Sequence, residues 1–255
     1  MNEPLGSKHM KTLGVILARG GSVGLKNKHL LPLLGWPVIA YTFDHARAAR
    51  SLDRVVVSTD DAKILRLAHG RGFEVVERPG ELATSDASVQ GVMLHALKTV
   101  ESRSDFRADA VVVLYGNVPV RPDDVVDSAL EVLGRTGCDS VRSFCPVGKW
   151  HPAWMSRLDG DKVNALHPGS IHRRQDLEPL FLHDGAVVAV SRASMLRGEL
   201  ARHDPHAFFG VDRRGIEVGT GETVEIDHLR DLFWAEAVLR ERLAGRAAVS
   251  IPEAA

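Results

Sequence analysis

The residues of this chain best suited to chemistry lie in one short loop near its N-terminus. An apolar run at 13–18 gives way to a loop of small and basic residues: Arg19, Gly20, Gly21, Ser22, Gly24, Lys26 and Lys28. Glycines leave backbone N–H groups accessible, and the three cations supply positive charge. A bound polyphosphate needs both features, so the loop predicts a nucleotide as the ligand.

The spacing of the glycines excludes two common phosphate-binding loops. The dinucleotide fingerprint needs G-x-G-x-x-G, whereas the glycines here stand at 20, 21 and 24. The P-loop needs a glycine followed directly by lysine, and Gly24 is followed by Leu25. Taken alone, the segment also fits an ordinary strand-to-helix turn with solvated lysines.

The elements that position this loop alternate between strand and helix, which predicts an α/β fold with a mostly parallel sheet and helices on both faces. The expected strands are 13–18, 54–58, 73–76, 110–114, 140–144, 185–190 and 222–226. The expected helices are 37–50, 62–70 (capped by Asp60), 87–101, 123–133 and 228–242. Ligands bind beyond the carboxyl ends of such strands, where loops 19–28, 59–61 and 115–121 would converge.

Composition narrows the classes of function. The chain has 255 residues, which suits one large domain, and its 32 basic residues nearly balance 33 acidic ones. We therefore expect neither a nucleic-acid nor a membrane partner. Cys138 and Cys145 lack metal-ligand spacing, so we expect reduced thiols in a cytoplasmic protein. Residues 1–11 lack a signal peptide's apolar core and are expected to be a disordered or added extension, and 244–255 a flexible tail.

Residues 146–176 interrupt the alternation of strands and helices. They contain Trp150, Trp154 and three histidines, and are too long and too rich in tryptophan for a plain loop. One interpretation is an arm or small subdomain that contacts a second copy, since aromatic residues are favoured in interface cores. The other is a connection that lies over the sheet.

Six short motifs in order indicate a family. They are Ala18-Arg-Gly-Gly-Ser-x-Gly, Val56-Val-Ser-Thr-Asp60, Arg78-Pro with Glu81-Leu-Ala, Arg174-Gln175, Asp184-Gly-Ala186 and Glu225-Ile-Asp227. Over residues 12–243 the chain resembles the acylneuraminate cytidylyltransferases (CMP-sialic acid synthetases) and, more distantly, the CMP-Kdo synthetases. The resemblance implies a Rossmann-like nucleotidyltransferase fold with a protruding arm at 146–176, a homodimer that exchanges this arm, Mg²⁺ dependence, and transfer of CMP from CTP to a sugar acid with release of pyrophosphate.

The same resemblance implies roles for individual residues. The catalytic residues would be Arg19, Lys28 and Asp227. The nucleotide would be bound by Leu17, Ala18, Arg19, Gly20, Gly21, Ser22, Lys28, Arg78 and Asn117. The acceptor would be bound by Tyr115, Arg174 and Gln175. Taken singly, Lys28 and Arg78 also fit solvated surface residues, and the basic patch at Arg174 also fits a solvated surface or a contact with a partner subunit.

Glu225 and Asp227 would hold the metal. They stand two apart on an expected strand, so both side chains face the same side. Mg²⁺ prefers hard oxygen ligands, often one or two carboxylates with substrate phosphates. The family usually has Asp at the first position, so we assign Asp227 as the ligand and Glu225 as a second or water-mediated ligand. The pair also fits a solvated strand, or an N-cap for the helix that follows.

Departures from the family pattern occur in the phosphate loop and in the acceptor pocket. Val23 replaces a lysine and His29 replaces an asparagine, while Lys26 stands where the family commonly has proline. Asn117 replaces the metal-binding aspartate of the CMP-Kdo synthetases, and Val188 replaces an aromatic residue. A pocket that loses a polar or aromatic partner rejects the old ligand. We therefore expect an acceptor other than N-acetylneuraminate.

The sequence supports a CTP-dependent cytidylyltransferase with a small anionic acceptor: a nonulosonic acid, another 2-keto-3-deoxy sugar acid or a phosphonate. One alternative is a nucleotidyltransferase that uses another NTP. A second is a nucleotide-binding protein without turnover, motivated by Val23 and Glu225. A nicotinamide oxidoreductase fits the α/β pattern, but the chain lacks its glycine fingerprint.

Overall fold

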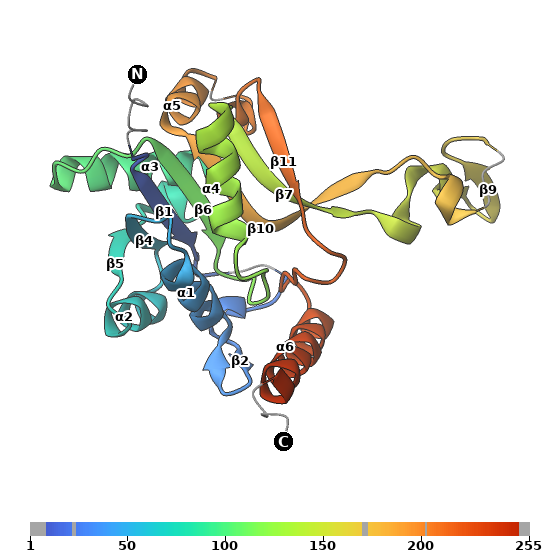
Figure 1. Cartoon of the computed structure of the whole chain (residues 1–255), viewed down its shortest axis with the longest axis horizontal. Coiled ribbons are helices and arrows are strands. Elements are labelled where there is room, and N and C mark those ends of the chain that lie inside the picture. Colours follow the sequence, from blue (N-terminus) through green and yellow to red (C-terminus); the bar gives the residue numbers. More distant parts are fainter. Residues whose placement is uncertain (1–8, 22–23, 170–172, 202, 250–255) are drawn as a thin grey trace, which may run out of the picture.

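A seven-stranded sheet with helices on both faces forms the body of the molecule in a computed structural model (Figure 1). The structure describes residues 9–21, 24–169, 173–201 and 203–249. The strand order is β11-β7-β10-β6-β1-β4-β5. Every pairing in this sheet is parallel except those of β10, which runs antiparallel to both of its neighbours. The α/β fold with a mostly parallel sheet is therefore confirmed.

The strands of the sheet lie close to their predicted positions. They are β1 (Thr12–Leu17), β4 (Arg54–Thr59), β5 (Glu74–Glu77), β6 (Ala110–Tyr115), β7 (Ser140–Pro146), β10 (Phe181–Ser191) and β11 (Arg213–Glu217). The sequence did not predict β11, nor the small hairpin of β2 (Pro32–Leu33) and β3 (Trp36–Pro37). The main apolar runs are buried because the central strands are covered on both sides.

The helices pack in two layers. On one face α1 (Val38–Ala48), α2 (Ala62–Gly70) and α4 (Val125–Thr136) share a hydrophobic core with Ile16 of β1. On the other face α3 (Val89–Arg103) and α5 (Arg192–Leu200) share a second core with Leu13, Val15 and Leu17. Alternate residues of one strand thus serve opposite faces. Among the helices that the structure describes, none combines the length and hydrophobicity of a membrane span.

The cap of α2 differs from the prediction by one residue. Asp61, not Asp60, accepts hydrogen bonds from the backbone N–H groups of Lys63 and Ile64, at 2.7 and 3.0 Å. Asp60 points instead to the loop after β1 and accepts from the N–H of Gly20 at 2.8 Å. The predicted cap is therefore wrong, because the carboxylate is engaged by a neighbouring loop.

The expected strand at 222–226 is also wrong. Val224 makes only an isolated bridge to Val120. The N–H of Ile226 donates to the carbonyl of Asn117 at 2.8 Å, so the segment pairs with the loop after β6 and crosses the ends of the strands. Glu225 and Asp227 consequently do not stand on a strand. A sequence that alternates apolar and polar residues does not show whether the segment pairs with a strand or with a loop.

The last helix, α6 (Leu229–Val249), continues seven residues beyond its expected end at residue 242. The flexible tail expected from residue 244 is therefore wrong as far as Val249, and residues 250–255 lie outside the described residues. Of the expected N-terminal extension, residues 1–8 also lie outside them. His9 pairs with Asp53 at 2.7 Å, and the N–H of Lys11 donates to Asp109, so residues 9–11 contact the body.

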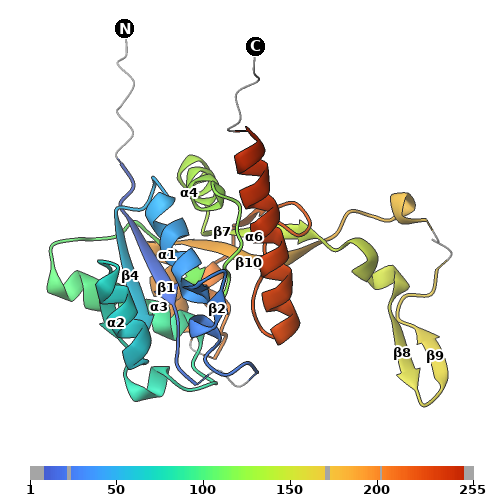
Figure 2. The same ribbon diagram turned by 90° about the horizontal axis from the view of Figure 1, so that it is seen from below.

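Residues between β7 and β10 form a protruding arm (Figures 1 and 2). Phe181 pairs with Pro146 at its base, and the hairpin of β8 (Ser156–Asp159) and β9 (Lys162–Ala165) lies at its far end. All eight residues of this hairpin are exposed. The segment reaches away from the body and does not lie over the sheet.

Arg121, whose burial the sequence did not reveal, joins β6, β10 and α1. Its guanidinium is fully buried and donates to the carbonyls of Ala186, Tyr115 and Val118 and to the hydroxyl of Thr42. Burial lowers its pKa to about 9, while the charges of Glu225 and Asp184 oppose that shift. The group therefore remains charged at neutral pH.

Replacing Arg121 with methionine should destabilise the fold by roughly 3–5 kcal/mol, because several buried acceptors lose their donor at once. Urea unfolding measures the loss. The matched control is Arg50→Met: its side chain is 86% exposed, and its ion pair with Asp127 should contribute less than about 1 kcal/mol. Equal effects of the two substitutions would contradict the role assigned to Arg121.

Candidate active site

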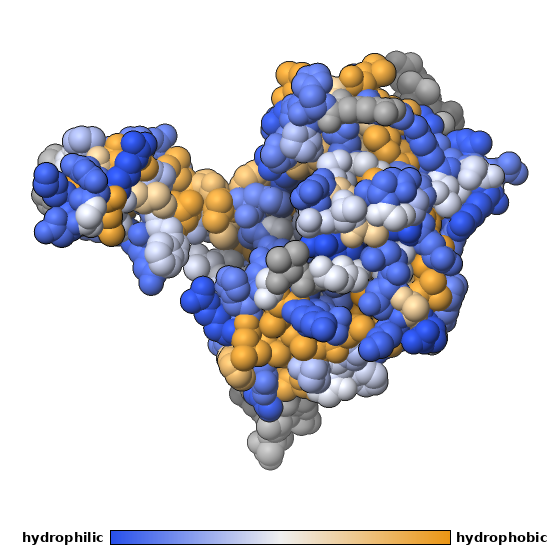
Figure 3. Space-filling view, turned by 180° about the vertical axis from the view of Figure 1, so that it is seen from behind, coloured by the Kyte–Doolittle hydropathy of each residue, from blue (hydrophilic) through white to orange (hydrophobic). Residues whose placement is uncertain are grey.

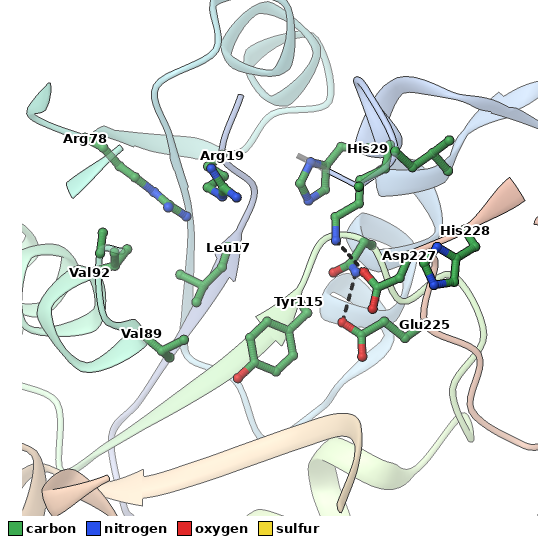
Figure 4. Close-up of a pocket in the computed structure, with 15 residues that line it drawn as sticks. Leu17, Arg19, His29, Arg78, Val89, Val92, Tyr115, Glu225, Asp227 and His228 are labelled. Carbon is green, nitrogen blue, oxygen red and sulfur yellow. Dashed lines mark hydrogen bonds and ion pairs between the residues drawn. The ribbon is translucent and has the colours of Figure 1, made fainter. Parts of the chain in front are cut away.

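One open pocket of about 510 Å³ lies over the carboxyl ends of β1 and β6. The loops after these strands meet there, as the sequence predicted. The structure brings together eight of the predicted site residues as its lining: Leu17, Arg19, Lys28, Arg78, Tyr115, Asn117, Glu225 and Asp227. Arg19 and Arg78 lie toward one side, and Glu225, Asp227 and His228 lie on the other (Figure 4).

The other predicted site residues lie outside this lining. Ala18 is buried, and Gly20 and Gly21 belong to the loop beside the pocket. Ser22 lies outside the described residues. Arg174 and Gln175 are exposed on the arm, in the short helix Arg174–Asp176. These two residues do not reach the pocket of their own chain.

The loop after β1 is fixed by hydrogen bonds to the neighbouring strand β4. The N–H of Ala18 donates to the carbonyl of Ser58 at 3.1 Å, and the N–H of Gly20 donates to Asp60 at 2.8 Å. Gly21 adopts a left-handed conformation with φ of 63°, which glycine accepts without strain. The loop can therefore turn sharply and present its cations to the pocket.

The pKa of His29 reflects the positive charges around the pocket, although the sequence analysis assigned this residue no role. Burial, together with the charges of Lys28, Arg78 and Arg19, lowers its pKa to about 3, so the ring is neutral at physiological pH. It packs on Gly116, where a Cβ would stand 3.0 Å from both the His29 ring and the Leu17 carbonyl. Only glycine fits this contact without displacing a neighbour.

Arg78 is held in place by the end of β4. Its guanidinium donates to the hydroxyl and to the carbonyl of Ser58, both at 3.0 Å. Burial and the charge of Arg19 lower its pKa to about 10, whereas Asp60 opposes the shift. Arg78 thus remains a cation, with its orientation set before any ligand binds.

The acidic side of the pocket is held by residues from two distant segments. Lys28 Nζ contacts Asp227 Oδ1 at 2.8 Å, and the Asn117 amide donates to Glu225 Oε1 at 3.0 Å. The same amide donates to the Ile226 carbonyl at 3.2 Å. Asn117, predicted to contact nucleotide, is therefore a positioning residue for Glu225. Burial and the charge of Glu225 raise the pKa of Tyr115 to about 12.

The donor set suits a divalent cation that is completed by a ligand. The described residues contain no group of three or more His, Cys, Asp or Glu side chains that could hold a metal alone. Glu225 and Asp227 nevertheless offer two carboxylates at one edge of the pocket. Mg²⁺ is commonly bound by one or two carboxylates together with substrate phosphates. The residues present fit such a site.

Apolar side chains form one wall of the pocket, and the sequence analysis gave them no part in the site. Val89 and Val92, in the first turn of α3, line the pocket beside Tyr115. Their helical spacing indicates a buried face but does not show which part of that face is left open at the end of the sheet. The pocket thus combines cations, carboxylates and an apolar wall, which suits a nucleotide and an anionic second ligand.

Comparison with known proteins places the chain in a family. Residues 13–153 match the family model described as cytidylyltransferase, so the chain belongs to the cytidylyltransferase family. An N-acylneuraminate cytidylyltransferase of Streptococcus agalactiae serotype V is 32% identical over 192 residues, 74% of this chain and 45% of that protein. The chain thus matches less than half the length of this relative.

Two further similarities cover nearly the whole chain. The post-translational flagellin modification protein B of Campylobacter coli is 26% identical over 231 residues, 90% of this chain and 95% of that protein. The solved structure of a CMP:2-keto-3-deoxy-manno-octonic acid synthetase complexed with CTP superposes with a TM-score of 0.67 at 18% identity. It covers 91% of this chain and 99% of that one, and shows the shared fold.

Proposed function

We propose that this protein transfers CMP from CTP to a small anionic acceptor and releases pyrophosphate. The observation that carries the proposal is the distribution of charge in the pocket: Arg19 and Arg78 lie toward one side, Glu225 and Asp227 lie on the other, and Lys28 contacts Asp227 (Figure 4). Nucleotidyl transfer needs this separation, because the leaving phosphates require cations while the reacting centre requires a metal. Family membership and the names of the similar proteins support CTP as the donor.

The basic loop would hold the triphosphate. Arg19 can bind phosphate oxygens through two donors and Lys28 through a point charge, while Arg78 lies beside them. The acceptor oxygen would attack the α-phosphorus, the bond from that phosphorus to the β-phosphate oxygen would break, and pyrophosphate would leave with the bonding electrons. Arg19 and Lys28 would neutralise the charge that develops on it.

Mg²⁺ would be held by Asp227 and by Glu225 directly or through water. When bound, it supplies positive charge at the α-phosphate and lowers the pKa of the attacking hydroxyl. Asp227 would have to exchange its contact with Lys28 for the cation, as Lys28 turns to the phosphates. Tyr115, with its pKa raised to about 12, would remain protonated and donate a hydrogen bond rather than act as a base.

The acceptor would be a nonulosonic acid, another 2-keto-3-deoxy sugar acid or a phosphonate. Val188 is buried and supplies no aromatic ring on the sheet face, and Asn117 is already bonded to Glu225. Both differences favour an acceptor other than N-acetylneuraminate. We also propose a cytoplasmic location, because Cys138 and Cys145 are free thiols. Recovery of the protein from a secreted fraction would contradict this location.

Pyrophosphate release, measured with each of the four NTPs against keto sugar acids and phosphonates, tests the reaction. CTP with at least one acid should give turnover, and ATP, GTP and UTP should give at least tenfold lower kcat/KM. Turnover with a different NTP instead of CTP would identify that nucleotide as the donor. Tight binding of CTP without turnover on any acid would favour a binding protein.

Replacing Asp227 with alanine should lower kcat by at least about a thousandfold, because the metal loses its principal ligand. Unfolding free energy should change by less than about 1 kcal/mol, since Asp227 is half-exposed. EDTA should abolish wild-type turnover and Mg²⁺ should restore it. Asp105→Ala, an exposed carboxylate elsewhere, is the matched control. Retained turnover in Asp227→Ala would rule out the metal assignment.

We also propose a homodimer in which the arm contacts a second copy. Arg174 and Gln175 are exposed on the arm, and apolar surface gathers along it (Figure 3). Trp150, Leu158 and Val163 on the arm are 68–74% exposed, and apolar surface left exposed in this way often marks a contact with another protein. A second copy would cover this surface and could bring Arg174 to its pocket.

Sedimentation tests the oligomeric state. The wild type should sediment as a dimer, and Leu158→Asp with Val163→Asp should shift it to a monomer, because buried charge opposes association. Leu200→Asp, an exposed apolar residue on α5 away from the arm, should remain dimeric. A monomeric wild type would contradict the proposal.

A further inference from the structure

Arg142 lies on the same sheet face as the pocket, and the proposed reaction gives it no role. It lies on β7, where it is opposite Val188 of β10, and Val188 is opposite Val113 of β6. Residues directly opposite one another share a face. Tyr115 stands two residues beyond Val113, so its side chain points to this face as well.

The guanidinium of Arg142 contacts two aromatic rings and has no hydrogen-bond or ion-pair partner among the residues that the structure describes. Its carbon lies 4.4 Å from the centre of the Phe209 ring and 5.1 Å from that of Phe144. Its Nε is buried without a hydrogen bond, and within the part of the chain that the structure describes no ion pair reaches this side chain. An unpaired, partly desolvated guanidinium is costly to keep.

The charges around Arg142 further disfavour its unpaired cationic form. Burial and the nearby positive charge of Arg213 lower its pKa, and Tyr115 gives only a small opposing effect. Arg213 differs from Arg142 in being exposed and in donating to the carbonyl of Gly210 at 2.7 Å. Of these two arginines, Arg142 is therefore the one whose guanidinium lacks both a protein acceptor and full hydration.

Tyr115 links this guanidinium to the reacting end of the pocket. Tyr115 lines the pocket together with Glu225, and its side chain lies on the sheet face that Arg142 shares. Val188, between Tyr115 and Arg142 on this face, is buried and carries no polar group that would pair with Arg142. An acceptor whose reacting oxygen lies near Glu225 would have to extend past Tyr115 to reach Arg142, which is only partly buried.

Building on the proposed function, we propose that Arg142 determines acceptor specificity by binding an anionic group of the acceptor on the side of Tyr115 away from Glu225 and Asp227. A carboxylate or a phosphonate would accept two parallel hydrogen bonds from the guanidinium. The rings of Phe144 and Phe209 would exclude water and fix the plane of the guanidinium. Arg174 on the arm would then not be the only arginine that binds the acceptor.

The test compares Arg142→Met, which keeps length and ring contact, with Arg142→Lys, which keeps charge. Arg213→Met is the matched control, because Arg213 also lies over Phe209, at 5.9 Å. N-acetylneuraminate, 3-deoxy-2-keto-octonate and 2-hydroxyethylphosphonate serve as acceptors with CTP. Arg142→Met should raise the acceptor KM about ten- to a hundredfold, as expected for loss of charge-assisted hydrogen bonds. The KM for CTP should change less than twofold.

Arg142→Lys should recover part of the loss, and Arg213→Met should behave as the wild type. An unchanged acceptor KM in Arg142→Met, or equal increases in both KM values, would overturn the inference and leave a purely structural role. Calorimetry with the same acids and CMP separates this result from failure of the proposed function. Binding of an acid that depends on Arg142 without turnover would support the inference alone; no Arg142-dependent binding would overturn it.

Discussion

One buried guanidinium holds the sheet together where its strand direction reverses. β6 runs parallel to β1 but antiparallel to β10, and the chain leaves the sheet in a loop after Tyr115. Arg121 donates hydrogen bonds to the carbonyls of Tyr115, Val118 and Ala186. Because a buried carbonyl without a donor is costly, the placement of Tyr115 and of the loop beyond it depends on this contact.

The charged groups of the pocket are paired with one another in a way that couples its two proposed ligands. Lys28 holds Asp227, and Asn117 holds Glu225. A polyphosphate competes with Asp227 for Lys28, while a divalent cation competes with Lys28 for Asp227. Either ligand therefore frees a group that the other one needs, and each should strengthen binding of the other.

Local signals in the sequence were sufficient for the sheet and for much of the pocket. The helix at 62–70 was predicted to its last residue, and the loop after β1 contributes Arg19 and Lys28 as expected. The segment 222–226 was misassigned because its partner is a loop about a hundred residues away. The burial of Arg121 and the ring contacts of Arg142 depend on which distant strands become neighbours, and neither periodicity nor a motif contains that information.

The two sides of the pocket come from segments that lie far apart in the sequence. Lys28 and its ion-pair partner Asp227 are separated by 199 positions. Closing so long a loop is entropically unfavourable until most of the intervening sheet has formed. A nascent chain released only as far as β6 would therefore carry the anion-binding cations without the carboxylates. Maturation of the site therefore waits for the segment that carries Glu225 and Asp227, not for the earlier loop that carries Lys28.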